Sequence, residues 1–254
     1  MQRRTSSLDG LVASLQQRYG TRAARRGDAL PSPPLPAVLP SGFATLDAAL
    51  PHGGFPRGAL TEFVGPRSAG ATTLALALIA RAQAAGDLAC LLDLGHSFAA
   101  TAAISAGVEL DALVVARPTD GEEAALTVAT LLARRAVGLL VVDSLPAWLA
   151  LPNGPAALAA LRTRLPRLLR ESGCALIVLH PLPTGLLPDP ADVGHSALAP
   201  ITALRLRLAH QGWLRRGPAI VGSRTQVTLL PPPFTTPLAT VAVELAFARG
   251  EDQA

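Results

Sequence analysis

A glycine-rich stretch, GPRSAGATT at residues 65–73, has the clearest chemical meaning in the sequence. It follows the apolar run 59–64, and its two glycines have the spacing of the phosphate-binding loop G-x-x-x-x-G-K-[ST]. In that motif, backbone N–H groups at the start of a helix cradle phosphates. We therefore predict a nucleotide-binding site in vestigial form. Its loop residues are Gly65, Pro66, Arg67, Ser68, Gly70, Ala71, Thr72 and Thr73.

The lysine of this motif is replaced by Ala71, whereas Thr72 keeps the position that binds Mg²⁺. The lysine ammonium normally reaches the β- and γ-phosphates and neutralises charge during phosphoryl transfer. A hydrogen bond to a charged group contributes about 1.5–3 kcal/mol, and alanine supplies none of it. Weak phosphate binding is compatible with the loop, but catalysis is not. Arg67 is the alternative cation, although it does not occupy the lysine position.

A carboxylate follows a second apolar run, 137–142, at Asp143. In open α/β sheets, ligands bind at the carboxyl ends of the strands. Asp143 is therefore added to the predicted nucleotide site, although such a residue also simply ends a strand.

The apolar runs predict an α/β fold with a mostly parallel sheet and an antiparallel end. Strands are expected at 59–64, 88–92, 113–116, 137–142 and 174–179, then at 201–209, 225–230 and 239–247. Helices are expected at 6–19, 41–50, 72–85, 99–106, 121–135 and 155–171. Pro166 is expected to kink or restart the last of these helices. The loop 180–200 is too long to be a simple connection.

Composition limits the class of protein. The chain has 254 residues, of which 50% are apolar and 4% aromatic, and this suits one α/β domain with small appendages. No apolar run is long enough to span a membrane, and no secretory signal is visible, so we expect a cytoplasmic protein. Cys90 and Cys174 lie in apolar runs and are expected to be reduced core thiols. No metal site is predicted.

The N-terminal segment predicts an amphipathic helix with Ser6 and Asp9 as a capping pair. Its apolar stripe consists of Leu8, Leu11, Val12 and Leu15. A proline-rich link follows at 31–40, so the helix must bury its stripe against its own core or a neighbouring molecule. We divide the chain into this helix and link (1–37), a core (38–250) and a tail (251–254).

Five stretches in the same order resemble the bacterial RecA recombinase family. They are 41–50, 53–58, 65–76, 139–144 and 222–227, the last followed by PPF at 232–234. The resemblance runs from about Leu8 to Gly250. It implies a RecA-like P-loop NTPase core, and we expect no counterpart of the family's C-terminal DNA-gathering domain.

The same resemblance implies that the catalytic positions are lost. The family's catalytic glutamate falls at Gly95, its adenine-stacking tyrosine at about Ala102, and its γ-phosphate-sensing glutamine at Pro181. The lysines that reach a neighbour's nucleotide are missing between Leu230 and Pro231, and the first DNA loop is shortened to 149–154. His96 is an alternative but weaker general base. The resemblance therefore implies a pseudo-ATPase, with no required cofactor and at most weak binding of ATP, ADP or Mg²⁺.

The net charge of +4 permits contact with a polyanion. Arginines expected to face outward on the terminal strands are candidate DNA-binding residues, with Trp213 as the nearby stacking candidate. These arginines are Arg205, Arg207, Arg215, Arg216 and Arg224.

The sequence is compatible with three functions. The first is a non-catalytic accessory or scaffold protein in DNA repair or the DNA-damage response. Its most specific form is an ImuA-type protein of translesion synthesis, which partners DNA polymerase-type repair proteins. The second is a recombinase that binds ATP and single-stranded DNA with unusual site chemistry. The third is a modulator of RecA filaments. Expected partners are protein partners, RecA or a second copy, and single-stranded DNA.

Overall fold

The computed structural model describes residues 2–21, 23–26, 37–182, 196–232 and 236–247, in two separate units, Met1–Leu35 and Pro36–Ala254. Parts of the predicted proline-rich link, of the loop 180–200 and of the PPF stretch lie outside the described residues, as does the tail 251–254. Among the residues described, no helix has both the length and the apolar character needed to cross a membrane.

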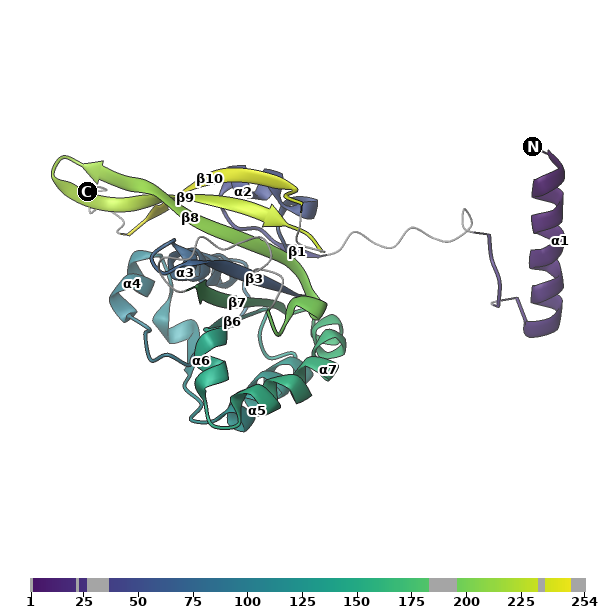
Figure 1. Cartoon of the computed structure of the whole chain (residues 1–254), viewed down its shortest axis with the longest axis horizontal. Coiled ribbons are helices and arrows are strands. Elements are labelled where there is room, and N and C mark those ends of the chain that lie inside the picture. Colours follow the sequence, from purple (N-terminus) through teal and green to yellow (C-terminus); the bar gives the residue numbers. More distant parts are fainter. Residues whose placement is uncertain (1, 22, 27–36, 183–195, 233–235, 248–254) are drawn as a thin grey trace. The chain divides into compact units, whose positions relative to one another are not determined.

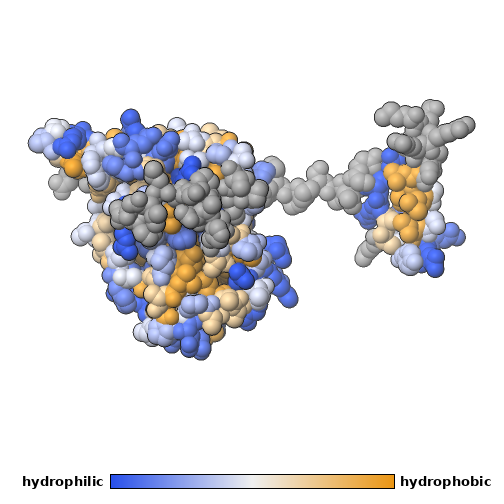
Figure 2. All heavy atoms as spheres, in the orientation of Figure 1, coloured by the Kyte–Doolittle hydropathy of each residue, from blue (hydrophilic) through white to orange (hydrophobic). Residues whose placement is uncertain are grey.

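The N-terminal unit contains helix α1, Gln2–Tyr19. Ser6 and Asp9 lie inside this helix, so the predicted capping pair is wrong; the arginines before them are good helix formers and extend the helix backwards. Asp9 instead forms an ion pair with Arg26 at 2.8 Å. The stripe side chains Leu8, Leu11 and Leu15 are exposed by 45%, 57% and 36%. Figure 2 shows apolar side chains gathered along this helix.

The second unit is built on an eight-stranded sheet in the order β10-β9-β8-β3-β7-β6-β4-β5, with a separate two-stranded sheet of β1 and β2 (Figure 1). The pairings among β3, β4, β5, β6, β7 and β8 are parallel, whereas the β8–β9 and β9–β10 pairings are antiparallel. This arrangement confirms the predicted α/β fold with its antiparallel end. The strands are β1 Val38–Leu39, β2 Phe55–Pro56, β3 Ala59–Pro66, β4 Ala89–Asp93, β5 Leu113–Ala116, β6 Leu139–Asp143, β7 Ala175–Leu182, β8 Thr202–Arg216, β9 Ala219–Leu230 and β10 Ala239–Ala246.

Helices cover both faces of the sheet (Figure 1). Along β6, Leu139 and Val141 join the apolar cluster that contains α3, whereas Leu140 and Val142 join the cluster that contains α5, α6 and α7. Alternating side chains thus fill two cores, as expected for parallel strands buried on both faces. The helices are α2 Ala44–Ala49, α3 Ala71–Ala84, α4 Ala100–Ser105, α5 Gly121–Ala133, α6 Leu145–Ala150 and α7 Gly154–Ser172.

Two predicted helices differ from the structure. The first begins at Ala44 and not at residue 41, because the Asp47 carboxylate accepts hydrogen bonds from the N–H groups of Ser41 (2.7 Å) and Gly42 (3.2 Å) and holds them in a loop. Helix α7 continues through Pro166 without restarting, and Leu165 and Leu169 on either side are buried in the core.

Cys90 and Cys174 are free and buried, which confirms the prediction of core thiols. Burial raises the pKa of each thiol to about 12. Both groups are therefore expected to stay protonated and unreactive at neutral pH.

Candidate phosphate-binding site

The glycine-rich loop joins the carboxyl end of β3 to the start of α3, as the sequence predicts. A Cβ at Gly65 would lie 2.4 Å from the carbonyl oxygen of Leu208 on β8, so only glycine fits there. Gly70 has a φ of 95° and precedes the first helical residue, Ala71. Glycine therefore satisfies a packing requirement at the first position and a conformational one at the second.

Contacts with the antiparallel strands hold the loop in place. The Thr225 hydroxyl on β9 donates a hydrogen bond to the carbonyl of Ala69 at 3.1 Å. A Cβ at Gly70 would meet the side chains of Thr225 and Leu245, on β9 and β10. The strands added at the end of the chain therefore support the loop from one side.

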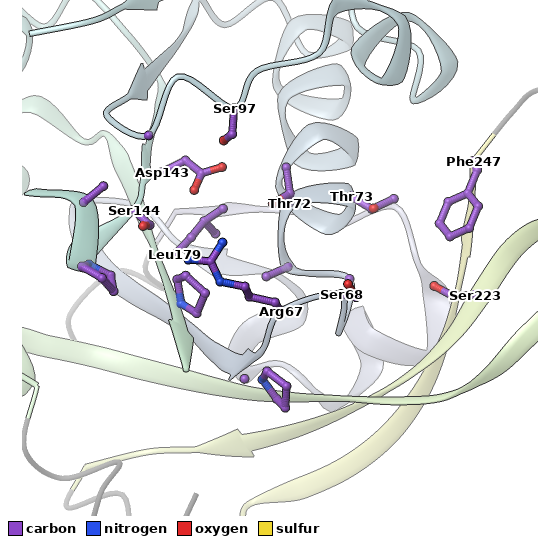
Figure 3. Close-up of a pocket in the computed structure, with 18 of the residues that line it drawn as sticks. Arg67, Ser68, Thr72, Thr73, Ser97, Asp143, Ser144, Leu179, Ser223 and Phe247 are labelled. Carbon is purple, nitrogen blue, oxygen red and sulfur yellow. The ribbon is translucent and has the colours of Figure 1, made fainter. Parts of the chain in front are cut away.

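The loop lines a pocket of about 810 Å³ at the carboxyl ends of the parallel strands (Figure 3). All nine residues predicted for the nucleotide site line it, including Asp143 at the end of β6. Gly95 and Pro181, which the RecA resemblance places at the base and sensor positions, also line it. The further lining residues were not predicted for this site, and they are Ser97, Ser144, Pro146, Ala147, Leu179, Trp213, Ser223 and Phe247.

The charges of the pocket come from Asp143 and Arg67. Burial raises the pKa of the Asp143 carboxyl, the neighbouring carboxylate Asp93 raises it further, and the Arg67 guanidinium opposes both effects. Figure 3 shows the Arg67 side chain extending from the loop across the pocket floor. Among the lining residues it is the only basic one. Arg67 thus occupies the pocket as a cation, as the sequence reasoning allowed.

The Asp93 carboxylate bonds to groups of the protein itself. Its carboxylate is 1% exposed, accepts the N–H groups of Ser97 (2.7 Å) and Phe98 (3.3 Å), and pairs with Arg117 at 2.9 Å. These bonds fold the turn that brings Gly95 to the pocket.

The positions that supply a base and sensors in the RecA resemblance carry no such groups here. Gly95 lines the pocket without a side chain, and Pro181 lines it without an N–H donor. Ala102 lines an adjoining cavity of about 60 Å³ beside α3, which shares Thr72, Ser97, Asp143 and Leu179 with the pocket. His96 is exposed and is not among the lining residues. The described pocket therefore keeps the phosphate-type loop, and it has no side chain at the position that supplies the base in the RecA resemblance.

The candidate DNA-binding arginines do not form one surface. Arg205 was predicted to face outward, and this is wrong: its side chain is fully buried and pairs with Glu62, with 2.9 Å between Arg205 Nε and Glu62 Oε2. Arg205 is buried because β8 lies inside the sheet between β3 and β9, where Arg205 is in register with Glu62. Arg207 is half-buried, and Arg224 pairs with Glu244. The exposed residues Arg215 and Arg216 lie at the end of the β8–β9 hairpin.

Comparison with known proteins agrees with this geometry. The RecA N-terminal domain family matches residues 8–153. Protein RecA of Chloroherpeton thalassium is 31% identical over 257 residues, which cover 94% of this chain and 71% of the relative. Protein RecA of Geobacter sulfurreducens is 30% identical, covering 98% and 78%, and that of Rhodococcus opacus is 32% identical, covering 97% and 75%. The chain therefore belongs to the RecA family.

Proposed function

We propose that this chain is a RecA-fold accessory protein of DNA repair that does not hydrolyse ATP. Membership in the RecA family links it to DNA repair and recombination. One observation carries the proposal of inactivity: the pocket keeps its loop, Thr72 and Asp143, but has Ala71 at the lysine position and Gly95 at the base position. The scaffold for a nucleotide is retained while the groups that perform phosphoryl transfer are missing.

The size of these losses supports inactivity. A general base typically contributes about 10²–10⁴-fold to a rate, and the lysine's charged hydrogen bond contributes about 1.5–3 kcal/mol. Arg67 restores positive charge but supplies no base, and the Asp93 carboxylate is already engaged by Arg117 and two backbone N–H groups. Binding of a phosphate is compatible with this pocket, whereas rapid cleavage is not.

The most specific form of the proposal is an ImuA-type role in translesion synthesis. In that role the chain is a scaffold that contacts a DNA polymerase-type repair protein. A second candidate, a modulator that docks on RecA, is favoured by the exposed apolar stripe of α1.

The test of inactivity is ATP hydrolysis by the purified full chain with and without single-stranded DNA. We expect no DNA-stimulated release of phosphate above background, which is at least about 10²-fold below an active recombinase assayed in parallel. Turnover at a rate comparable with that recombinase would refute the proposal.

The structure also accommodates the missing groups. A Cβ at Gly95 would have only Ser97 Oγ within 4 Å, at 3.9 Å, and Gly95 is not among the glycines with positive φ. Ala71 begins α3 and lines the pocket. Replacing both residues, Ala71→Lys with Gly95→Glu, is expected to tighten ATP binding roughly 10- to 150-fold and to produce measurable hydrolysis. The matched control is Ala71→Met with Gly95→Gln, which adds similar bulk without the charges and should remain inactive.

A further inference from the structure

Helices α5 and α7 end side by side in a group of exposed arginines. The two helices pack on the same face of the sheet and lead into β6 and β7, which are parallel neighbours, so the helices run in the same direction (Figure 1). Their first residues are in contact, because a Cβ at Gly121 would lie 2.5 Å from the Cα of Gly154. Their last turns therefore lie together near the amino ends of the strands. The exposed arginines of this basic end of α5 and α7 are Arg134, Arg135, Arg164, Arg167 and Arg170.

Few carboxylates balance these charges. Arg167 pairs with Glu171 one turn further along α7, with 2.7 Å between Arg167 Nε and Glu171 Oε1. At the same edge of the sheet, Asp87 pairs with Arg57, whose guanidinium also donates to the carbonyl of Gly138 just before β6. Within the part of the chain that the structure describes, the other four arginines of the basic end form no ion pair. They are Arg134, Arg135, Arg164 and Arg170.

Arg135 holds a backbone conformation that favours glycine. Its φ is 52°, and the N–H groups of Arg135 and Ala136 close the end of α5 with bonds of 3.0 Å each to carbonyls of its last turns. Helices α3 and α4 end with the same pair of bonds, and there the left-handed residue is Gly86 or Gly107. A side chain at this position destabilises the backbone relative to glycine. The chain therefore carries an arginine where its other helices of this type carry glycine.

The helix macrodipole does not account for Arg135. Cations near the carboxyl end of a helix are favourable, and Arg170 in the last turn of α7 has this position. At α5, Arg134 already supplies a cation at the helix end in an ordinary helical conformation. A second cation at the left-handed position therefore needs another reason.

We infer that the basic end of α5 and α7 is a docking surface for an acidic segment of a partner protein. Guanidinium groups pair with carboxylates through charge-assisted hydrogen bonds, and the bond between Arg167 and Glu171 shows one such pair on this surface. Neither helix carries an aromatic side chain, so the bases of single-stranded nucleic acid would find no ring on which to stack. The glycine-rich loop lies at the opposite, carboxyl ends of the strands. Docking on the basic end is therefore independent of nucleotide and of the proposed lack of hydrolysis.

A short fluorescein-labelled peptide of alternating glutamate and alanine tests the surface, and fluorescence anisotropy measures its binding to the full chain at low salt. Arg135→Gln with Arg170→Gln removes one cation from each helix end and is expected to raise the dissociation constant roughly 3- to 30-fold. The matched control is Arg215→Gln with Arg216→Gln, which removes the same charge from exposed residues at the end of the β8–β9 hairpin. The control should bind the peptide within about twofold of wild type, because charges far from the peptide are screened.

Replacement of Arg135 by glycine separates binding from folding. Glycine adopts the left-handed conformation without the steric cost, so Arg135→Gly is expected to raise the midpoint of thermal unfolding by about 2–4 °C. The same variant should weaken binding of the peptide roughly 2- to 5-fold, because it removes one guanidinium from the surface. A gain of stability together with a loss of affinity is the result that a purely structural arginine would not give.

Equal losses of affinity in the two double variants would assign binding to net charge and would overturn the inference. A failure of the peptide to bind at millimolar concentration would overturn it as well. Binding of a DNA duplex but not of the peptide, with loss in Arg135→Gln with Arg170→Gln, would assign the surface to nucleic acid and not to an acidic protein segment. Unchanged affinity in Arg135→Gly would also count against the inference, because the surface would then not use its left-handed arginine.

Discussion

Replacement of Arg205 by alanine is expected to lower the free energy of unfolding by about 3–5 kcal/mol. The side chains of Arg205 and Glu62 are both fully buried, and they pair across strands β8 and β3. Removing the guanidinium leaves the Glu62 carboxylate in the core without its cation. The loss arises from this uncompensated charge and not from a large intrinsic strength of the pair.

Urea denaturation followed by circular dichroism measures the effect. Arg207→Ala is the matched control, because Arg207 lies two residues further along the same strand and is only half-buried. We expect that control to change stability by about 0.5 kcal/mol or less. Replacing both partners with apolar residues, Arg205→Met with Glu62→Leu, should cost less than Arg205→Ala alone. Equal stability of Arg205→Ala and Arg207→Ala would show that the Glu62 charge is not buried in the native state.

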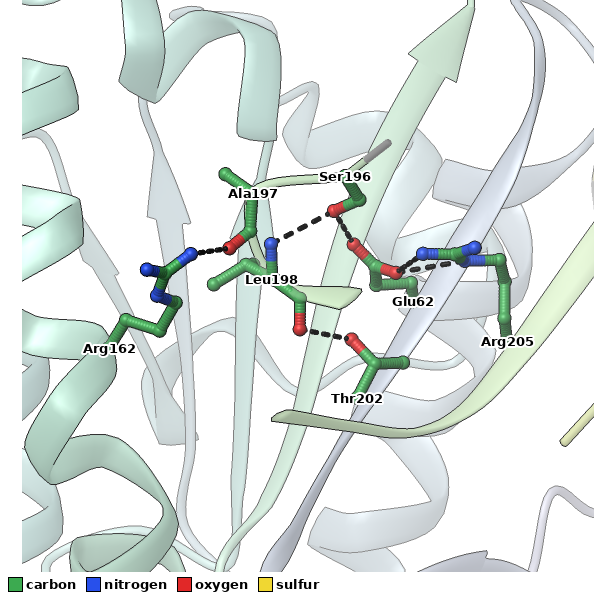
Figure 4. A network of polar contacts seen from close by, with 7 residues as sticks. All are labelled: Glu62, Arg162, Ser196, Ala197, Leu198, Thr202 and Arg205. Atoms are coloured by element: carbon green, nitrogen blue, oxygen red, sulfur yellow. Dashed lines mark hydrogen bonds and ion pairs between the residues drawn. The ribbon is translucent and has the colours of Figure 1, made fainter. Parts of the chain in front are cut away.

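The same ion pair anchors the segment that leads into β8 (Figure 4). The Ser196 hydroxyl donates to Glu62, and Arg162 on α7 donates to the carbonyl of Ala197 at 2.9 Å. The Thr202 hydroxyl donates to the carbonyl of Leu198 at 2.9 Å. On β7, which pairs with β3 on the side away from β8, burial lowers the pKa of His180. His180 follows the pocket-lining residue Leu179. The Arg205–Glu62 pair and the Ser196 hydroxyl therefore tie β3, β8 and the segment before β8 together.

The sequence predicts the parallel core well because each strand is a short apolar run between polar turns. The loop was predictable because the spacing of Gly65 and Gly70, followed by Thr72, lies between an apolar run and a helical pattern, as the phosphate-loop motif requires. Arg205 was misplaced because alternation along a strand tells which residues share a face but not whether that face is covered. A signal was present in Glu62, a carboxylate inside a buried run that needed a buried cation.

The contact between the rings of Trp213 and Phe247, with centroids 6.1 Å apart, could not be predicted from the sequence. Trp213 and Phe247 are far apart in the chain and meet only because β8, β9 and β10 pair in one register. Sequence patterns specify register weakly, and a shift of one residue would turn Trp213 to the other face of the sheet. The sequence therefore predicts the phosphate end of the pocket, but not that Trp213 and Phe247 meet beside it.

The second prediction with a large expected effect concerns association through the apolar stripe of α1. Leu8, Leu11 and Leu15 are exposed on their unit, and burying such a stripe contributes on the order of several kcal/mol at roughly 25 cal/mol per Å². The RecA resemblance implies that this helix docks on a neighbouring subunit, at the interface where that family binds nucleotide. The sensing positions are changed here, with proline at residue 181. We therefore expect self-association, or association with RecA, that does not respond to nucleotide.

Leu11→Asp with Leu15→Asp should abolish this association, because two carboxylates cannot be buried in an apolar contact without partners. The matched control is Ala13→Asp with Gln17→Asp, which places the same charges at the same spacing on the opposite face of the helix, where both residues are exposed. Sedimentation velocity with and without ATP measures assembly of each variant, alone and mixed with RecA, while circular dichroism checks that the core stays folded. A wild type that is strictly monomeric and binds no RecA, or one that assembles only with ATP, would contradict the prediction. Loss of assembly in both double variants would assign it to net charge and not to the stripe.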